Sequence, residues 1–187
     1  EKKSALAKFE SHHMPLKNVV HKKLPDWNID ARNKEQAFAI DMLMDPSIKI
    51  VSLIGRAGSG KTLCAIASGL QQTLGHGDNH YDRLIVSRPV QPLGKDIGYL
   101  PGTMEEKMKP WLMPIQDNID FLLNGKKESM DMFFENGTIQ IEALTYIRGR
   151  SISNAFIIVD EAQNLTRHEL KTIITRVGEN TKIILTG

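Results

Sequence analysis

Short apolar runs recur along the chain, and polar or glycine-containing segments separate them. The first run, Ile50 to Ile54, precedes residues 55–62, which contain three glycines, and then the apolar segment Leu63 to Leu70. A short run rich in β-branched residues is typical of a strand buried in a parallel sheet. The pattern therefore predicts a strand, a glycine loop and a helix, in that order.

Further apolar runs extend this pattern into an α/β fold. They predict strands at 83–87, 138–143, 155–159 and 181–186. Helical spacing of apolar residues predicts helices at 33–44, 104–109, 112–123 and 168–177. Strands that alternate with helices predict a mostly parallel sheet that helices flank on both faces.

Residues 1–30 differ in composition from the rest of the chain, because they are polar and basic and are interrupted by Pro15 and Pro25. We interpret them as a linker or arm that precedes a domain at 31–187. Six lysines face two glutamates between Glu1 and Lys23, a local charge of about +4 in a chain of net charge +2. This basic segment is either a solvated linker or a contact for RNA, DNA or an acidic partner.

The composition of the chain bears on its cellular location and on the presence of membrane segments and zinc. Cys64 is the only cysteine, which excludes an internal disulfide and favours a reducing, cytoplasmic location. No apolar run approaches 18 residues, so we expect neither a signal peptide nor a membrane partner. The six histidines are scattered, so we expect no zinc site.

Residues 55–62 form a complete phosphate-binding loop motif. Glycine has no Cβ, so backbone N–H groups around Ser59 can converge on phosphate oxygens. Lys61 is predicted to reach the outer phosphates, and the Thr62 hydroxyl to ligate Mg²⁺. The candidate nucleotide-binding residues are Gly55, Arg56, Ala57, Gly58, Ser59, Gly60, Lys61 and Thr62.

An acid pair, Asp160 and Glu161, follows the apolar run at 155–159. The carboxyl ends of the strands are where α/β sheets bind their ligands. We predict that Asp160 completes the Mg²⁺ site that Thr62 begins, and that Glu161 is the base that activates water against the γ-phosphate of ATP. The alternative is a solvated acidic turn that caps a helix.

The segment Asp160-Glu161-Ala162-Gln163 resembles the acidic motif of superfamily 1 and related RNA and DNA helicases. Residues 32–36 resemble the adenine-recognition element of those enzymes. The Gln36 amide offers one donor and one acceptor, which complement the N6 and N7 edge of adenine. Gln36 is therefore a candidate adenine ligand, with an ordinary surface position as the alternative.

Longer motifs resemble the PhoH family of phosphate-loop ATPases over residues 30–187. They are Ser87 to Val90, Gly98 to Gly102, Met104 to Met108, Pro110-Trp111, Ile147 to Ser151, Asp160 to Thr166 and Lys171 to Gly178. The resemblance implies a RecA-like core that hydrolyses ATP with Mg²⁺. It is strongest to the branch in which a PIN-type ribonuclease domain precedes the ATPase, which implies RNA unwinding coupled to cleavage.

The family pattern continues beyond the last residue of this sequence. In the family the final strand runs into Gly-Asp and then a Gln that senses the γ-phosphate, whereas these residues stop at Leu185-Thr186-Gly187. The resemblance therefore implies a C-terminally incomplete ATPase domain, weakly active or inactive by itself. Family likeness also leaves a homo-oligomeric ring open.

Three arginines are candidate contacts for phosphate or nucleic acid: Arg88, Arg148 and Arg150. A guanidinium fork matches phosphate oxygens, and structural ion pairing is the alternative. The leading hypothesis is thus an ATPase that acts on single-stranded RNA or another nucleic acid. A nucleotide-switched assembly module and a small-molecule kinase are the rivals, and a dedicated water-activating Glu161 argues against the kinase.

Overall fold

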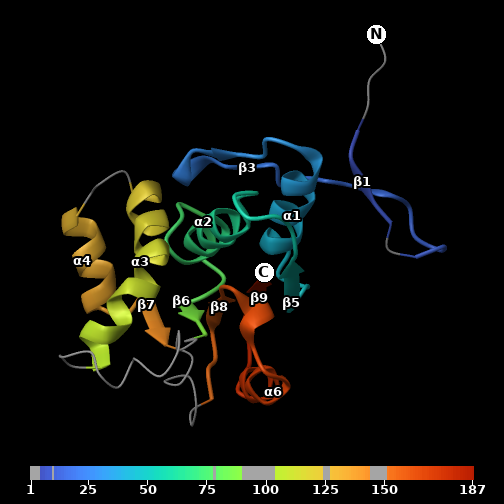
Figure 1. Cartoon of the computed structure of the whole chain (residues 1–187). Helices are drawn as coiled ribbons and strands as arrows, with labels where there is room; N and C mark the ends of the chain where they lie inside the picture. Colours follow the sequence, from blue (N-terminus) through green and yellow to red (C-terminus); the bar gives the residue numbers. More distant parts are fainter. Residues whose placement is uncertain (1–4, 10, 78, 90–103, 124–126, 144–150) are drawn as a thin grey trace.

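The computed structural model describes residues 5–9, 11–77, 79–89, 104–123, 127–143 and 151–187. Its centre is a five-stranded sheet in which all strands are parallel, in the order β5-β9-β8-β6-β7 (Figure 1). The strands are β5 (Ile50–Leu53), β6 (Arg83–Arg88), β7 (Ile139–Ala143), β8 (Ala155–Val159) and β9 (Lys182–Thr186). The mostly parallel α/β sheet predicted from the sequence is confirmed.

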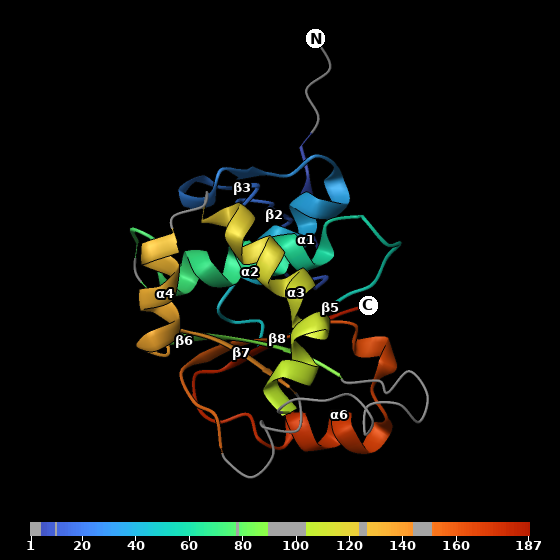
Figure 2. The ribbon, with the colours of Figure 1, turned by 60° about the vertical axis from the view of Figure 1, so that its left-hand side comes forward.

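Helices cover both faces of this sheet, as Figure 2 shows from the side. One face carries α1 (Lys34–Met44), α2 (Lys61–Thr73) and α3 (Met104–Leu122), with α4 (Lys127–Glu135) packed beside them against β7. The other face carries α6 (Arg167–Ile174), which follows the short 3₁₀ turn Ala162–Asn164. Two-sided cover is what a parallel sheet requires, because the intervening helices must pack on its faces.

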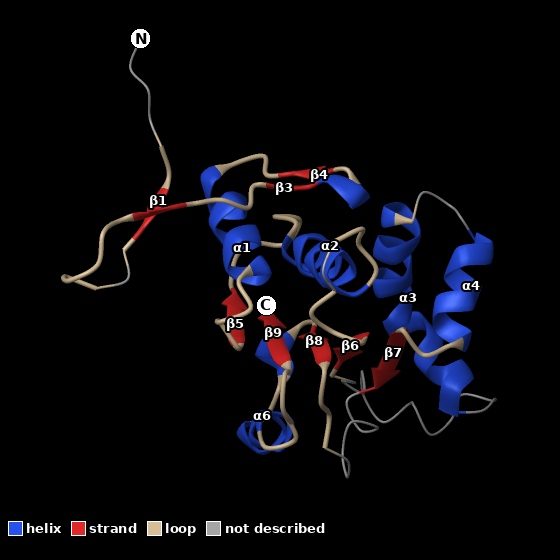
Figure 3. Cartoon of the chain, turned by 180° about the vertical axis from the view of Figure 1, so that it is seen from behind, coloured by secondary structure: helices blue, strands red, loops and turns tan. Residues whose placement is uncertain are grey.

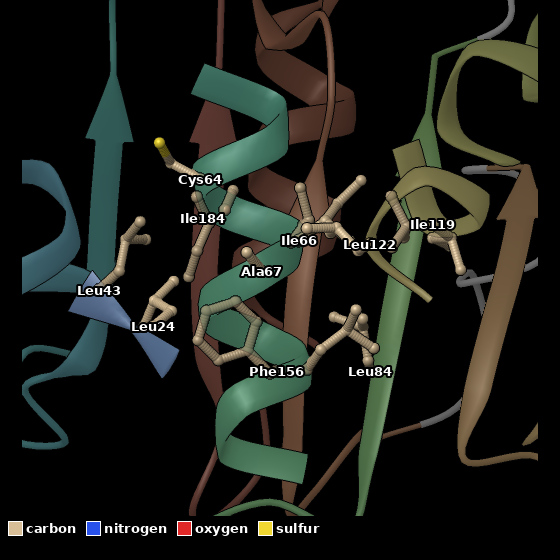
Figure 4. Close-up of a cluster of buried hydrophobic side chains, with 14 of the residues drawn as sticks. Leu24, Leu43, Cys64, Ile66, Ala67, Leu84, Ile119, Leu122, Phe156 and Ile184 are labelled. Carbon is tan, nitrogen blue, oxygen red and sulfur yellow. The ribbon is translucent and has the colours of Figure 1, made fainter. Parts of the chain in front are cut away.

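Side chains of the central strands alternate between two buried clusters. In β8, Phe156 and Ile158 pack toward the α2 face, whereas Ile157 and Val159 pack toward α6. Figure 4 shows the larger cluster around α2, where Ile66 and neighbouring residues meet apolar side chains of the sheet and of α3. The burial of both faces explains why the strand sequences are continuously apolar instead of alternating.

Helix α2 packs unusually close to the sheet at Gly69. A Cβ atom at this position would lie 2.7 Å from Leu84 Cδ1 and 2.9 Å from Phe156 Cδ1. Glycine therefore allows the helix that begins at the phosphate-binding loop to pack directly on β6 and β8.

Residues 19–30, within the segment interpreted as a linker or arm, contact the main body of the fold. Leu24, in the small antiparallel pair β3 (Lys23–Leu24) and β4 (Ile29–Asp30), is only 1% exposed and belongs to the α2 cluster. The preceding pair, β1 (Ala7–Lys8) and β2 (Lys17–Asn18), extends away from the main body (Figures 1 and 3). It is tied to α1 by an ion pair of 2.8 Å between Lys8 Nζ and Asp41 Oδ2.

The helices differ from the sequence prediction in α3, in α4 and at the end of α6, which was expected to reach residue 177 and ends at Ile174. The two helices expected at 104–109 and 112–123 are one helix, α3, with Pro110 and Pro114 inside it. Helix α4 has no predicted counterpart. No helix in the described ranges is long and apolar enough to cross a membrane.

Candidate nucleotide site

The loop of residues 55–62 connects β5 to α2, as predicted. Gly58 and Gly60 have φ values of 73° and 85°, in the left-handed region that favours glycine. Gly60 is the N-cap of α2, so the loop delivers backbone N–H groups and the positive end of the helix dipole to one point. This arrangement suits the binding of a phosphate group.

Lys61 lies folded over the loop that precedes it. Its Nζ donates hydrogen bonds to the carbonyl oxygens of Gly55 at 2.7 Å and Arg56 at 2.9 Å. These contacts place the ammonium group at the rim of the loop, where it can exchange a carbonyl partner for a phosphate oxygen.

Asp160 joins the loop to the middle of the sheet. It follows β8, is 6% exposed, and its Oδ1 accepts hydrogen bonds from the Thr62 hydroxyl at 2.8 Å and the Thr186 hydroxyl at 2.7 Å. Its backbone N–H donates to the Ser87 carbonyl at 2.8 Å. The backbone of Asp160 is thus held by β6, and its carboxylate by β9 and the first turn of α2.

This cluster has the donor chemistry that Mg²⁺ requires. The ion takes oxygen ligands, and Asp160 and Thr62 supply a carboxylate and a hydroxyl within hydrogen-bond distance of each other. The Thr62 hydroxyl can donate its proton to Asp160 while its lone pairs face a cation. Within the described residues no group of three or more His, Cys, Asp or Glu is placed to bind a metal.

Glu161 is held by two neighbours. Its backbone is left-handed, with a φ of 54°, and its Oε1 lies 3.4 Å from Nη2 of Arg88. Its Oε2 accepts a hydrogen bond from Nε2 of Gln163, in the 3₁₀ turn. Glu161 is therefore beside Asp160, as expected, and is paired with the arginine that the sequence suggested as a phosphate contact.

A cavity of about 420 Å³ unites these elements. It is large enough for a nucleotide's phosphates and bound water. Loop residues and both acids line it, together with residues that the sequence analysis did not select as site residues, among them Asn118 of α3, Gln163 and Thr186. Gln163 belongs to the acidic motif at 160–163, whereas Asn118 and Thr186 stand alone in segments distant from the loop, so no local motif indicated them.

Gln36 connects α1 to the opposite side of the loop. Its Nε2 donates to the Ser59 carbonyl at 3.0 Å, and its Oε1 accepts from the Arg32 backbone N–H at 2.8 Å. A second cavity of about 210 Å³ opens there, with Met42, Ile54 and Gln36 among its lining residues. Ile54 is 89% exposed, so this cavity has an apolar wall beside the amide.

Cys64, which the sequence analysis did not select, and two of the candidate arginines remain to be placed. Cys64 lines the second cavity but is buried, and burial raises the pKa of its thiol, which suits a packing role. Arg148 and Arg150 lie outside the described residues, as does the motif from Gly98 to Gly102.

Comparison with known proteins gives a consistent assignment. Residues 28–187 match the family described as "PhoH-like protein". The chain is 55% identical over 174 residues to "Protein PhoH2" of Bacillus subtilis, covering 92% of this chain and 39% of that protein. It is 38% identical over 161 residues to "Protein PhoH2" of Mycolicibacterium smegmatis, with 86% and 36% covered. A "PhoH-like protein" of Synechocystis is 36% identical over 181 residues, with 96% and 53% covered.

Proposed function

Because the chain belongs to the PhoH family, a family of P-loop ATPases, we propose that it binds ATP with Mg²⁺ and couples ATP hydrolysis to the binding or unwinding of single-stranded RNA or another nucleic acid. The chain spans about two-fifths of the length of the Bacillus subtilis relative. The activity of the whole protein, including any PIN-type ribonuclease domain, any homo-oligomeric ring and a cytoplasmic location, is part of this proposal.

One observation carries the hydrolytic part of the proposal. The Asp160 carboxylate accepts hydrogen bonds from Thr62 and Thr186, so the phosphate-binding loop and the acid pair meet in one cavity. A binding loop alone would support retention of a nucleotide. An adjoining acid pair at the end of a parallel strand supports its hydrolysis.

Each residue then has a definite chemical role. The loop N–H groups and Lys61 bind the phosphates, and Gln36 recognises the adenine edge. Thr62 and Asp160 hold Mg²⁺, which when bound supplies positive charge to the phosphate oxygens. Glu161 orients a water molecule and accepts its proton during attack on the γ-phosphate.

Two substitutions, made in the full-length protein, test the ATPase assignment. Lys61→Ala should weaken ATP binding, because it removes a charge from the outer phosphates. Glu161→Gln should retain ATP binding but lower kcat about 100-fold or more, because it removes the base while keeping the shape. Normal turnover by Glu161→Gln would place the base elsewhere.

The nucleic-acid part of the proposal requires a separate test. Single-stranded RNA should accelerate ATP turnover, whereas a nucleotide-switched assembly module would bind ATP without this stimulation.

Changing Arg148 and Arg150 together to Ala should weaken RNA binding equally for unrelated sequences, because backbone contacts carry no sequence information. Each lost phosphate contact should reduce, by about 0.7, the steepness with which the logarithm of the RNA-binding constant falls with the logarithm of the salt concentration. An unchanged slope would assign these arginines a structural role.

A further inference from the structure

Arg88 connects three parts of the fold at the edge of the nucleotide site. It is the last residue of β6, and its side chain is 22% exposed. One guanidinium nitrogen, Nη2, lies 3.4 Å from Glu161 Oε1, and the other, Nη1, donates to the Trp111 carbonyl of α3 at 3.5 Å. Arg88 therefore ties the proposed catalytic base to a neighbouring strand and a helix.

These contacts restrict Glu161 as a base. A general base accepts a proton from water through a carboxylate oxygen that reaches that water. Arg88 occupies Oε1, and the Gln163 amide occupies Oε2. Each carboxylate oxygen keeps a second lone pair, so these partners do not exclude water, but together they fix the direction in which the carboxylate points. Glu161 can turn toward an attacking water only when one of these partners is released.

Of the two partners, Arg88 can move away from Glu161 without disturbing a nucleotide in the cavity. Gln163 lines the 420 Å³ cavity together with Glu161, whereas Arg88 is not among its lining residues in the described part of the chain. Arg88 thus reaches Glu161 from outside the cavity. Both its contacts are longer than the 2.7–2.9 Å of a strong charge-assisted hydrogen bond, so a better anion can displace them.

We propose that Arg88 is a positioning residue that restrains Glu161, and that a nucleic-acid backbone phosphate releases Glu161 by taking over the Arg88 guanidinium. Phosphate oxygens match the guanidinium fork. The inference rests on the proposed function and adds the means by which nucleic acid stimulates ATP turnover.

The test compares Arg88→Ala with the wild-type protein, measuring kcat and KM for ATP with and without single-stranded polyuridine. Arg88→Ala should raise the kcat measured without RNA about two- to fivefold, because the interaction energy of a partly exposed ion pair corresponds to a factor of this size. KM should not change, because Arg88 lies outside the nucleotide cavity. Added RNA should then stimulate the variant much less than the wild type.

Two further variants separate restraint from folding. Arg83→Ala removes an arginine from the opposite end of β6, where Nη2 contacts the Ser153 carbonyl at 3.4 Å, and should retain wild-type kinetics. Arg88→Lys keeps a positive charge near Glu161 and should restore a low RNA-free kcat. Thermal unfolding of all three variants checks that the fold is intact.

Several results would overturn the inference. An RNA-free kcat of Arg88→Ala that equals the wild-type value, with full stimulation by RNA, would mean that the pair does not restrain Glu161. A lower kcat would instead assign Arg88 to the γ-phosphate. If RNA stimulates the wild-type protein, either of these results for Arg88→Ala leaves the proposed function intact. A wild-type protein without ATP turnover would overturn both the proposed function and this inference.

Discussion

Thr186→Val is the most direct test of how the loop and the acid pair are held together. Thr186 is 1% exposed, and its hydroxyl donates to Asp160 Oδ1 at 2.7 Å. Valine replaces this hydroxyl by a methyl group of similar size, so it removes a hydrogen bond without opening a cavity. A hydrogen bond to a charged group contributes about 1.5–3 kcal/mol to the free energy of unfolding. Water cannot compensate easily, because Asp160 is only 6% exposed.

Thermal unfolding measures this loss. For a chain of this length, about 1.5–3 kcal/mol corresponds to a decrease in Tm of about 3–12 °C. The Mg²⁺ concentration that half-saturates ATP turnover should also rise, because Asp160 then keeps only the Thr62 hydroxyl of the two that fix it among the described residues.

Thr186→Ser is the matched control, since it keeps the hydroxyl and loses only a methyl group. It should cost about 1 kcal/mol and leave the Mg²⁺ requirement unchanged. If the valine variant unfolds at the wild-type temperature with an unchanged Mg²⁺ requirement, the cluster does not organise the site. Equal effects of both substitutions on Mg²⁺ would assign the contribution of Thr186 to packing.

Three other substitutions test separate features. Gln36→Ala should reduce the preference for ATP over GTP in competition binding, because the base edge loses its amide; an equal loss for both nucleotides would limit Gln36 to fixing the loop through Ser59. Gly69→Ala should destabilise the fold by about 1–3 kcal/mol through overpacking against Leu84 and Phe156, whereas Gly77→Ala, whose added Cβ would meet no atom of the described residues within 4 Å, should be neutral in urea unfolding. Lys182 is fully buried and donates to the Met42 and Asp45 carbonyls, and burial lowers its pKa from 10.5 to about 8. Between these two pH values the folded state therefore binds fewer protons than the unfolded state. The contribution of Lys182 to the free energy of unfolding should rise from about pH 8 to pH 10.5, by at most about 3 kcal/mol. Lys182→Met should abolish that rise, and an identical pH dependence of stability in both proteins would contradict this prediction.

The sheet could be predicted well because its signal is local. β8 coincides with the predicted run at 155–159, and the other strands differ by one residue at an end. Helix α3 was divided incorrectly, since proline removes a backbone donor and normally ends a helix. In the structure, buried residues that follow Pro114, such as Ile115 and Ile119, pack on the core and stabilise one continuous helix.

The site was predictable only as far as its motifs are contiguous. The loop and the acid pair each lie within a few residues, and their roles follow from those residue types. Thr186 has no such signal, because a single threonine at the end of a strand acquires meaning only when β9 lies beside β8. Arg88 is similar: its sequence suggests an anion contact, but pairing with Glu161 depends on β6 and β8 being neighbours.

The place of β9 in the sheet determines when this site can form during synthesis. β9 is the last of the described strands in sequence, yet it lies between β5 and β8, with residues 50–53 paired to residues 183–186. Such long-range parallel pairing is slow, because the intervening chain must be ordered first. Until the ribosome has released β9, the loop strand and the acid strand expose unpaired edges that can aggregate. The site is therefore completed only after most of this segment has been synthesised.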